Sequence, residues 1–205
     1  MLDIKLMAHP SRAEHVQKML NQLGLPDSIV VWDDRPQGGD AMYTARKAWS
    51  LPLPDDCTHR LVLQDDLELC DNFVQIAEQI SNRHPTYAIS LINFNKKPKN
   101  PDHVFPYYLT SILSGCAIML PKDVIQPCME WCKTASEEVA LHDDLSISCY
   151  CLKHGVIMIT TSPSLVQHLN HASLLPYKYT WERVALDFEK EPRADWGTKK
   201  VYSKF

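Results

Sequence analysis

The stretch HRLVLQDDLELC, residues 59–70, decides the fold, because it joins a buried strand to an abrupt run of negative charge. Residues 61–63 form a continuous apolar run, which is typical of a strand that is buried on both faces of a parallel sheet. Asp65 and Asp66 follow almost at once. Like charges this close repel each other and lose hydration on burial, so either a bound cation or exposure to water must offset the cost. The stretch therefore predicts a core strand that ends at a charged site.

Strand-like and helix-like segments alternate on both sides of this stretch. We expect strands at residues 2–8, 28–34, 60–64, 87–93, 115–120 and 156–161, and helices at residues 11–23, 40–49, 71–80, 122–133 and 143–154. Successive β-α units place helices on both faces of a mostly parallel sheet. The sequence therefore predicts a single α/β domain with a Rossmann-type sheet.

Local signals predict the ends of several helices. Ser11 and Glu14 have the spacing of a capping box, and Gly24 is placed to end the same helix. Asp40 is expected to cap the next helix. Pro127 is expected to kink or interrupt the helix that contains it, because proline lacks the backbone N–H that a helix uses.

The domain is expected to span residues 1–175, with residues 176–205 forming a tail packed on it. The tail is rich in aromatic side chains, whose exposure would favour aggregation. The segment 95–106 is polar and broken by prolines, so we interpret it as a mobile lid or an acceptor-side loop rather than a domain linker.

Composition narrows the class of protein. The net charge of −4 and the pI of about 6.1 argue against attachment to nucleic acid through the overall field, although a local basic groove stays compatible with them. No apolar run approaches the roughly 20 residues of a membrane helix, and Asp3 and Lys5 break any secretory signal. Seven cysteines without a framework-like spacing indicate reduced thiols. We therefore expect a cytoplasmic protein without a membrane contact.

The charged side chains follow strand ends, where open α/β sheets bind their ligands. Arg12 follows the first strand, Asp34 the second, and Asp65 and Asp66 the third. Carboxylate oxygens are hard ligands that favour Mg²⁺ or Mn²⁺, and Mg²⁺ commonly completes its shell with substrate phosphate oxygens. The acidic pair therefore predicts a nucleotide diphosphate bridged by a metal ion.

Further residues are candidates for binding that diphosphate and its nucleoside. Neither a Walker loop nor a G-x-G-x-x-G motif occurs in the sequence, so Arg12 and Arg46 are the candidates to neutralise the phosphates. Asp34, or its neighbour Asp33, is placed to accept a hydrogen bond from a uracil ring N–H.

The order of these segments resembles the GT-A-fold glycosyltransferases, which use nucleotide-sugar donors. The resemblance covers roughly residues 4–174 and rests on VVWDDRPQGG, ARKAW, HRLVLQDDLELCDNF, SGCAIMLPKDVI, LHDDLSISCYCLKHG and SPSLVQHLNHASL. Gln64 stands where a strict D-x-D motif has its first acid. The resemblance therefore implies Asp66 as a ligand of Mn²⁺ or Mg²⁺, with Asp65 near the donor ribose or the metal.

The same resemblance implies roles for residues later in the chain. Asp144 becomes the general base and Asp143 its support, at the start of a helix whose dipole favours negative charge. General-base help is typically worth about 10²–10⁴-fold, and an in-line base implies inversion at the anomeric carbon. His168 approaches the metal, with His171 as the alternative.

Ser114 and Gly115 line the acceptor side by the same resemblance. The compact chain is similar to small phage-type enzymes, some of which glycosylate hydroxymethylated bases in DNA. Basic residues at 96–99 and 199–200 are placed to contact phosphates of such an acceptor. A glycan or a small molecule is the other acceptor class. The alternatives to a glycosyltransferase are a nucleotidyltransferase and a catalytically inactive nucleotide- or carbohydrate-binding module.

Overall fold

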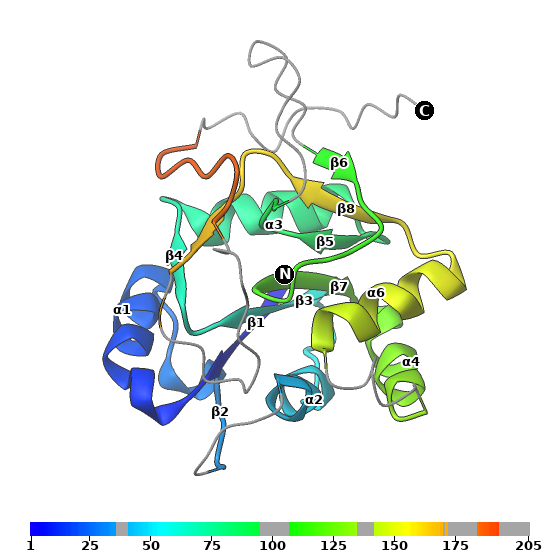
Figure 1. Ribbon diagram of the computed structural model, residues 1–205, viewed down its shortest axis with the longest axis horizontal. Coiled ribbons are helices and arrows are strands. Elements are labelled where there is room, and N and C mark those ends of the chain that lie inside the picture. The colour runs from blue at the N-terminus through cyan, green and yellow to red at the C-terminus, as the bar shows by residue number, and fades with distance from the viewer. Residues whose placement is uncertain (36–40, 95–106, 135–141, 170, 172–183, 193–205) are drawn as a thin grey trace.

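Seven strands of the computed structural model form one sheet: β1 (Leu2–Ala8), β2 (Val30–Trp32), β3 (His59–Gln64), β5 (Ala88–Ser90), β6 (Tyr107–Leu109), β7 (Ala117–Pro121) and β8 (Met158–Thr161). Their order across the sheet is β2-β1-β3-β7-β5-β8-β6 (Figure 1). Strands β1, β2, β3, β5 and β8 point one way, and β6 and β7 point the other way. The sheet is therefore mostly parallel. The structure describes residues 1–35, 41–94, 107–134, 142–169, 171 and 184–192.

Helices cover both faces of this sheet (Figure 1): α1 (Ala13–Leu23), α2 (Ala41–Ser50), α3 (Phe73–Arg83), α4 (Lys122–Cys132) and α6 (Asp143–His154). Helices α1 and α3 pack their apolar side chains against one face, and α2, α4 and α6 pack theirs against the other. The structure thus confirms the predicted single α/β domain with a Rossmann-like sheet.

The central strand β3 is buried as its sequence predicts. Leu61 and Leu63 are fully buried in the core under α1 and α3, whereas Val62 points into the opposite core under α2 and α4. Burial of each such side chain is worth about 1.5–3 kcal/mol. Strand β3 pairs in parallel with β1 and antiparallel with β7, so it has a hydrogen-bonded neighbour on each side.

The start of α1 differs from the predicted capping box. Ser11 lies in a 3-10 turn, η1 (Pro10–Arg12), and α1 begins at Ala13. Proline favours the first turn of a helix, and the ring of His9 accepts a hydrogen bond from the Ser11 N–H, so the turn is capped by histidine instead of serine. The prediction for the other end is confirmed, since Gly24 adopts a left-handed conformation with φ of 65° directly after α1.

Several other boundaries also differ from the prediction. The second strand is shorter than residues 28–34, because the 3-10 turn η2 (Asp27–Ile29) takes up its beginning. Helix α4 continues through Pro127 without interruption, although that residue removes one backbone donor. Asp40 and the segment 95–106 lie outside the described residues.

The strand β7 is antiparallel to both of its neighbours, so its first residues, and not its last, lie at the edge where the parallel strands end. Just before β7, the carbonyl oxygen of Cys116 accepts a hydrogen bond from the N–H of Gln64 at the end of β3, at 2.9 Å. The residues that precede β7 therefore lie at the same edge as the acids that follow β3.

A separate two-stranded sheet extends this edge. It consists of β4 (Leu67–Leu69) and β9 (Val166–His168), which pair antiparallel with Leu67 opposite His168. The sequence did not predict it, because each strand has only three residues. The pairing of Leu67 with His168 nevertheless brings His168, from near the end of the chain, to the acidic pair.

The opposite edge of the large sheet contains a buried ion pair. The guanidinium of Arg60 is fully buried and donates to the carboxylate of Asp3. It also donates to four carbonyl oxygens in and after α2, those of Ala48, Trp49, Leu51 and Pro52. Arg60 therefore joins the end of α2 to the beginning of the sheet, and this contact is structural.

The described part of the tail, residues 184–192, packs on the strand ends. The N–H of Leu186 donates to the carbonyl oxygen of Asn93 at 3.0 Å. The carboxylate of Asp187 accepts hydrogen bonds from the hydroxyl groups of Ser162 and Ser164. This segment therefore joins the turns that follow β5 and β8.

All seven cysteines are free thiols, and six of them are buried. Within the described ranges, the chain forms no helix that is both long enough and apolar enough to cross a lipid bilayer.

Candidate functional site

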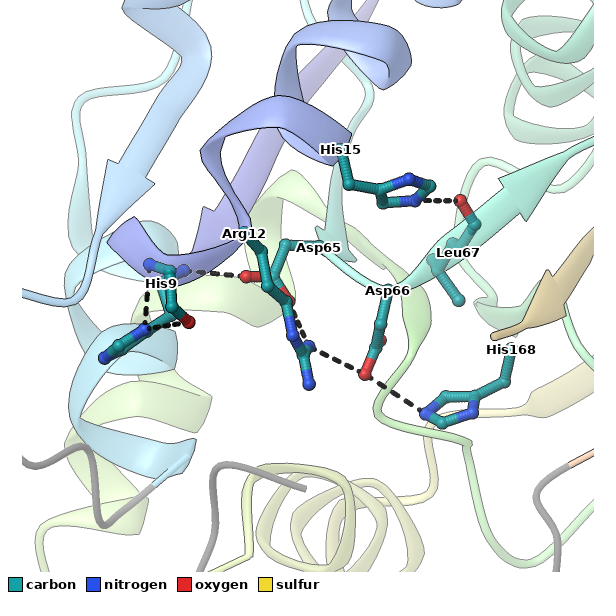
Figure 2. A network of polar contacts seen from close by, with 8 residues as sticks. His9, Arg12, His15, Asp65, Asp66, Leu67 and His168 are labelled. Carbon is teal, nitrogen blue, oxygen red and sulfur yellow. Dashed lines mark hydrogen bonds and ion pairs between the residues drawn. The ribbon is translucent and has the colours of Figure 1, made fainter. Parts of the chain in front are cut away.

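The two aspartates that follow β3 share one guanidinium. Arg12 Nη1 lies 2.6 Å from Asp65 Oδ1 and 2.9 Å from Asp66 Oδ2 (Figure 2). All three side chains are largely buried, with exposed fractions of 8–13%. The sequence predicted that these residues would meet at strand ends, and the structure brings them into direct contact. An arginine therefore supplies the positive charge that the adjacent carboxylates need.

Backbone and histidine contacts hold the acidic pair in place. The N–H of His9, directly after β1, donates to Asp65 Oδ2 at 2.7 Å. In the first turn of α1, His15 Nε2 lies 3.0 Å from the carbonyl oxygen of Leu67, the residue that follows Asp66 (Figure 2). Neither histidine was predicted as part of the site. His9 acts through its main chain, which leaves no signal in a side-chain pattern.

His168 reaches the same cluster from the far end of the chain. Its Nε2 lies 3.3 Å from Asp66 Oδ2 (Figure 2), and the next N–H, that of Leu169, donates to the Asp66 carbonyl oxygen at 2.7 Å. The alternative candidate, His171, instead places its ring against that of His15, with 5.5 Å between the ring centroids. Of the two candidate histidines, His168 is the one beside Asp66.

The environment moves the pKa values of the two aspartates in opposite directions. Burial raises the pKa of Asp65, and the charge of Arg12 offsets only part of that increase. Burial also acts to raise the pKa of Asp66, but contacts with His168 and Arg12 outweigh it and the pKa is lowered. Burial alone would lower the pKa of Arg12, yet the two carboxylates raise it overall. Asp66 is therefore the member of the pair that is more strongly held as an anion.

A second acidic pair opens α6. Asp144 Oδ1 accepts a hydrogen bond from the N–H of Leu145 at 2.8 Å, and Oδ2 accepts one from the N–H of Gly115 at 3.3 Å. Asp143 is buried, whereas Asp144 is partly exposed. These hydrogen bonds and the helix N-terminus orient the Asp144 carboxylate. Of the pair, Asp144 is therefore the residue accessible to a substrate.

Gly115 allows α6 to approach this closely. A Cβ atom at position 115 would lie 3.0 Å from Asp143 Oδ1 and 3.3 Å from Asp144 Cβ, closer than ordinary van der Waals contact. Two serine hydroxyls support the same segment: Ser148 accepts from the Leu113 N–H at 2.9 Å, and Ser90 accepts from the Ser114 N–H at 3.3 Å. Three successive backbone N–H groups are thus each held by a side chain.

The two acidic pairs lie at one edge of the sheet. Gln64 is hydrogen-bonded to Cys116, so Asp65 on one strand and Gly115 on its neighbour are the next residues toward the edge. Gly115 in turn binds Asp144. The cluster of Arg12, the two aspartates and His168 therefore lies at the same edge of the sheet as the oriented carboxylate of Asp144.

Two of the predicted donor-binding residues have partners elsewhere. Asp34 is exposed and pairs with Lys47 Nζ at 2.8 Å, and it also accepts from the hydroxyl of Tyr43. Arg46 donates to the carbonyl oxygen of Cys132 at the end of α4, at 3.2 Å. The structure therefore does not join Asp34 and Arg46 to the acidic pair by any contact among the described residues.

Asp33, the neighbour of Asp34, is also paired with a basic side chain. Asp33 accepts hydrogen bonds from Arg35 Nε at 2.9 Å and from Nη2 at 2.7 Å, and these contacts lower its pKa to about 2. The guanidinium of Arg35 lies over the ring of Tyr43, 4.1 Å from the centroid. Asp33 is therefore a paired anion, and a uracil ring would have to compete with Arg35 for it.

The residues around Asp66 fit a hard divalent ion with few protein ligands. Within the described part of the chain, Asp66 Oδ1 and His168 Nδ1 are buried without a hydrogen-bond partner. The described residues contain no group of three or more His, Cys, Asp or Glu side chains placed to hold a metal. A carboxylate and an imidazole suit Mn²⁺, and Mg²⁺ often uses one or two protein ligands with phosphate oxygens and water. Asp66 and His168 are therefore the residues that would hold such an ion.

Comparison of the sequence with known protein families and with curated proteins identifies no match to either. The class of this protein therefore has to be inferred from the fold and the site.

Proposed function

We propose that this protein is a metal-dependent glycosyltransferase that moves a sugar from a nucleoside-diphosphate sugar, with UDP as the expected nucleotide, to an acceptor hydroxyl. The observation that carries the proposal is the assembly of Arg12, Asp65, Asp66 and His168 at the edge that also holds Asp144. The sheet is of the kind that binds nucleotides at the carboxyl ends of its strands. The motif order that resembles GT-A enzymes supports the same class.

The cluster at Asp66 suits the donor diphosphate. A divalent ion held by Asp66 and His168 would supply positive charge to the departing diphosphate. Arg12 adds a cation whose planar guanidinium matches phosphate oxygens. Because the cluster is largely buried, its electrostatic interactions are stronger than they would be in water. With a divalent ion bound, the cluster would present net positive charge where a leaving group gains negative charge.

The carboxylate of Asp144 suits the acceptor hydroxyl. Its oxygens are oriented by the N–H groups of Gly115 and Leu145. In the proposed reaction the acceptor oxygen forms a bond to the anomeric carbon, and the bond from that carbon to the diphosphate breaks. The acceptor proton passes to Asp144. Attack opposite the leaving group inverts the anomeric carbon, and Asp143 supports the helix start from its buried position.

The acceptor belongs to one of two classes, a hydroxymethylated base in DNA or a glycan or small molecule. The basic segments predicted to contact DNA, at residues 96–99 and 199–200, lie outside the described residues. The choice between the two acceptor classes is therefore left to the experiment that follows.

The deciding experiment combines the purified protein with Mn²⁺, a panel of nucleotide sugars and both classes of acceptor, and detects products by mass spectrometry. A product whose mass increases by one sugar residue, formed only with Mn²⁺ or Mg²⁺, supports the proposal. Release of pyrophosphate from nucleoside triphosphates with no sugar transfer would instead indicate a nucleotidyltransferase. Nucleotide binding with no product from any combination would indicate a binding module.

Three matched variants assign the roles. Asp66→Asn should abolish Mn²⁺-dependent UDP binding, and Asp144→Asn should retain UDP binding but stop transfer. Asp56→Asn is the control, because it makes the same change at an exposed residue before β3, at the opposite edge of the sheet. Full turnover by both site variants would refute the mechanism.

A further inference from the structure

Arg12 occupies the oxygens that a metal ion would use. A single nitrogen, Nη1, contacts Asp65 Oδ1 at 2.6 Å and Asp66 Oδ2 at 2.9 Å. A divalent ion bound to Asp66 would place a second positive charge beside this nitrogen, in a site that water reaches poorly. Arg12 and the ion therefore compete for the same anionic pair.

One carboxylate oxygen of Asp66 has no partner among the described residues. Asp66 Oδ2 is taken by Arg12 and His168, while Oδ1 is buried and lacks a hydrogen-bond partner among the described residues. A buried carboxylate oxygen without a donor carries an unmet desolvation cost, and an incoming cation relieves it. Oδ1 of Asp66 can thus become a ligand of the ion as Arg12 is displaced from Oδ2.

Arg12 is placed to move without disturbing the fold. It stands between the turn η1 and the helix α1, and its backbone N–H donates to the carbonyl oxygen of His9 at 2.9 Å. That bond anchors the main chain independently of the guanidinium, so a change of side-chain rotamer need not move the backbone. A guanidinium displaced from two carboxylates is well suited to bind a diphosphate in its place.

We propose that Arg12 is the resident counter-ion of Asp65 and Asp66 before ligands bind, that a divalent ion displaces it, and that the displaced guanidinium then binds the donor diphosphate. Metal binding therefore precedes donor binding. This inference rests on the proposed function for the identity of the donor, but the displacement by metal is measurable without any sugar transfer.

The first test measures the affinity for MnCl₂ alone, by calorimetry and by the loss of the free Mn²⁺ signal in electron paramagnetic resonance. Arg12→Gln removes the competing cation, so we expect it to bind Mn²⁺ at least about tenfold more tightly than the natural protein. Arg12→Lys keeps a point charge without the planar fork and should be intermediate. Arg35→Gln removes another arginine, which pairs with Asp33 instead of the cluster, and its Mn²⁺ affinity should be unchanged.

The second test measures UDP binding with and without Mn²⁺. The natural protein should bind UDP only with Mn²⁺ present, and Arg12→Gln should bind UDP more weakly despite its tighter Mn²⁺ binding. Thermal melting confirms that each variant is folded, and Arg12→Lys serves as the test variant if Arg12→Gln is not. Equal or weaker Mn²⁺ binding by the folded Arg12 variant, or no Mn²⁺ binding by any form of the protein, would overturn the displacement.

The two proposals fail in different ways. If Arg12→Gln binds Mn²⁺ more tightly but the natural protein transfers no sugar to any acceptor, the proposed function is wrong and the displacement stands. If sugar is transferred while the Mn²⁺ affinities of Arg12→Gln and the natural protein are equal, the proposed function stands and the displacement is wrong.

Discussion

Substitution of Gly115 by alanine is the sharpest test of the carboxylate assigned to the acceptor side. The added Cβ would lie 3.0 Å from Asp143 Oδ1 and 3.3 Å from Asp144 Cβ, whereas ordinary contact begins at 3.4 Å, so we expect the start of α6 to move by up to about 0.4 Å. The hydrogen bond from the Gly115 N–H to Asp144 Oδ2 is already 3.3 Å long, and the same movement would break it. The substitution therefore displaces Asp144 without changing it.

The expected loss follows from these distances. Because a misplacement of about 1 Å at a reacting group can cost on the order of 10²-fold in rate, a movement of 0.4 Å predicts a fall in kcat of about tenfold. The KM for the donor should stay unchanged, since Arg12, Asp65 and Asp66 lie outside the altered contact. Crowding of this kind typically costs about 1–3 kcal/mol of stability. Steady-state kinetics with the donor varied, together with urea unfolding, measure both quantities.

Gly155→Ala provides the matched control. Gly155 follows α6 with φ of 69°, and a Cβ there would meet no atom within 4 Å. Alanine in this left-handed conformation should cost about 1 kcal/mol of stability and leave kcat unchanged. If Gly115→Ala keeps the natural kcat, or if both glycine variants lose kcat in proportion to stability, the role given to Asp144 is refuted.

Three further predictions follow from the contacts described above. His168→Ala should weaken Mn²⁺ binding whereas His171→Ala should not, since only the former lies beside Asp66; equal effects in calorimetry would contradict the assignment. Arg60→Leu should lower the free energy of unfolding by about 3–5 kcal/mol in urea, because it leaves four carbonyl groups and one carboxylate oxygen of Asp3 without their donor, while Lys5 still pairs with the other oxygen. The Asp33 carboxyl has its pKa lowered from 3.8 to about 2 by Arg35, so its contribution to stability is present above the ordinary pKa and is lost as the pH falls toward 2. Arg35→Gln should abolish that part of the acid destabilisation, and an unchanged pH profile of unfolding would disprove it.

The sequence predicted the parts of the fold that have strong local patterns. The apolar run at 61–63, the helical face of α1 and the glycines that end α1 and α6 each reflect interactions within a few residues along the chain. The contact between Arg12 and the acidic pair could also be predicted from the sequence, because parallel strands bring their carboxyl ends to one edge.

The features that the sequence missed depend on long-range pairing. The antiparallel direction of β7 is set by its hydrogen bonds to β3 and β5, and its residues would be equally apolar in a parallel strand. The β4-β9 pair is too short to give an alternating pattern. Asp34 was predicted to bind the donor from its position after a strand, and Arg46 from its residue type. Neither signal reveals the local partners, Lys47 and the carbonyl group of Cys132.

Because β7 runs opposite to β3, the segment that positions Asp144 and the segment that carries Asp65 and Asp66 belong to different parts of the chain. The chain reaches this edge at Asp65 and Asp66, after β3, and leaves it through residues 113–116, before β7. Lengthening or replacing the segment before β7 would reshape the neighbourhood of Asp144 and leave the aspartate–arginine cluster intact. Under the proposed function, changes in this one segment would alter the choice of acceptor and keep the residues proposed to bind the donor.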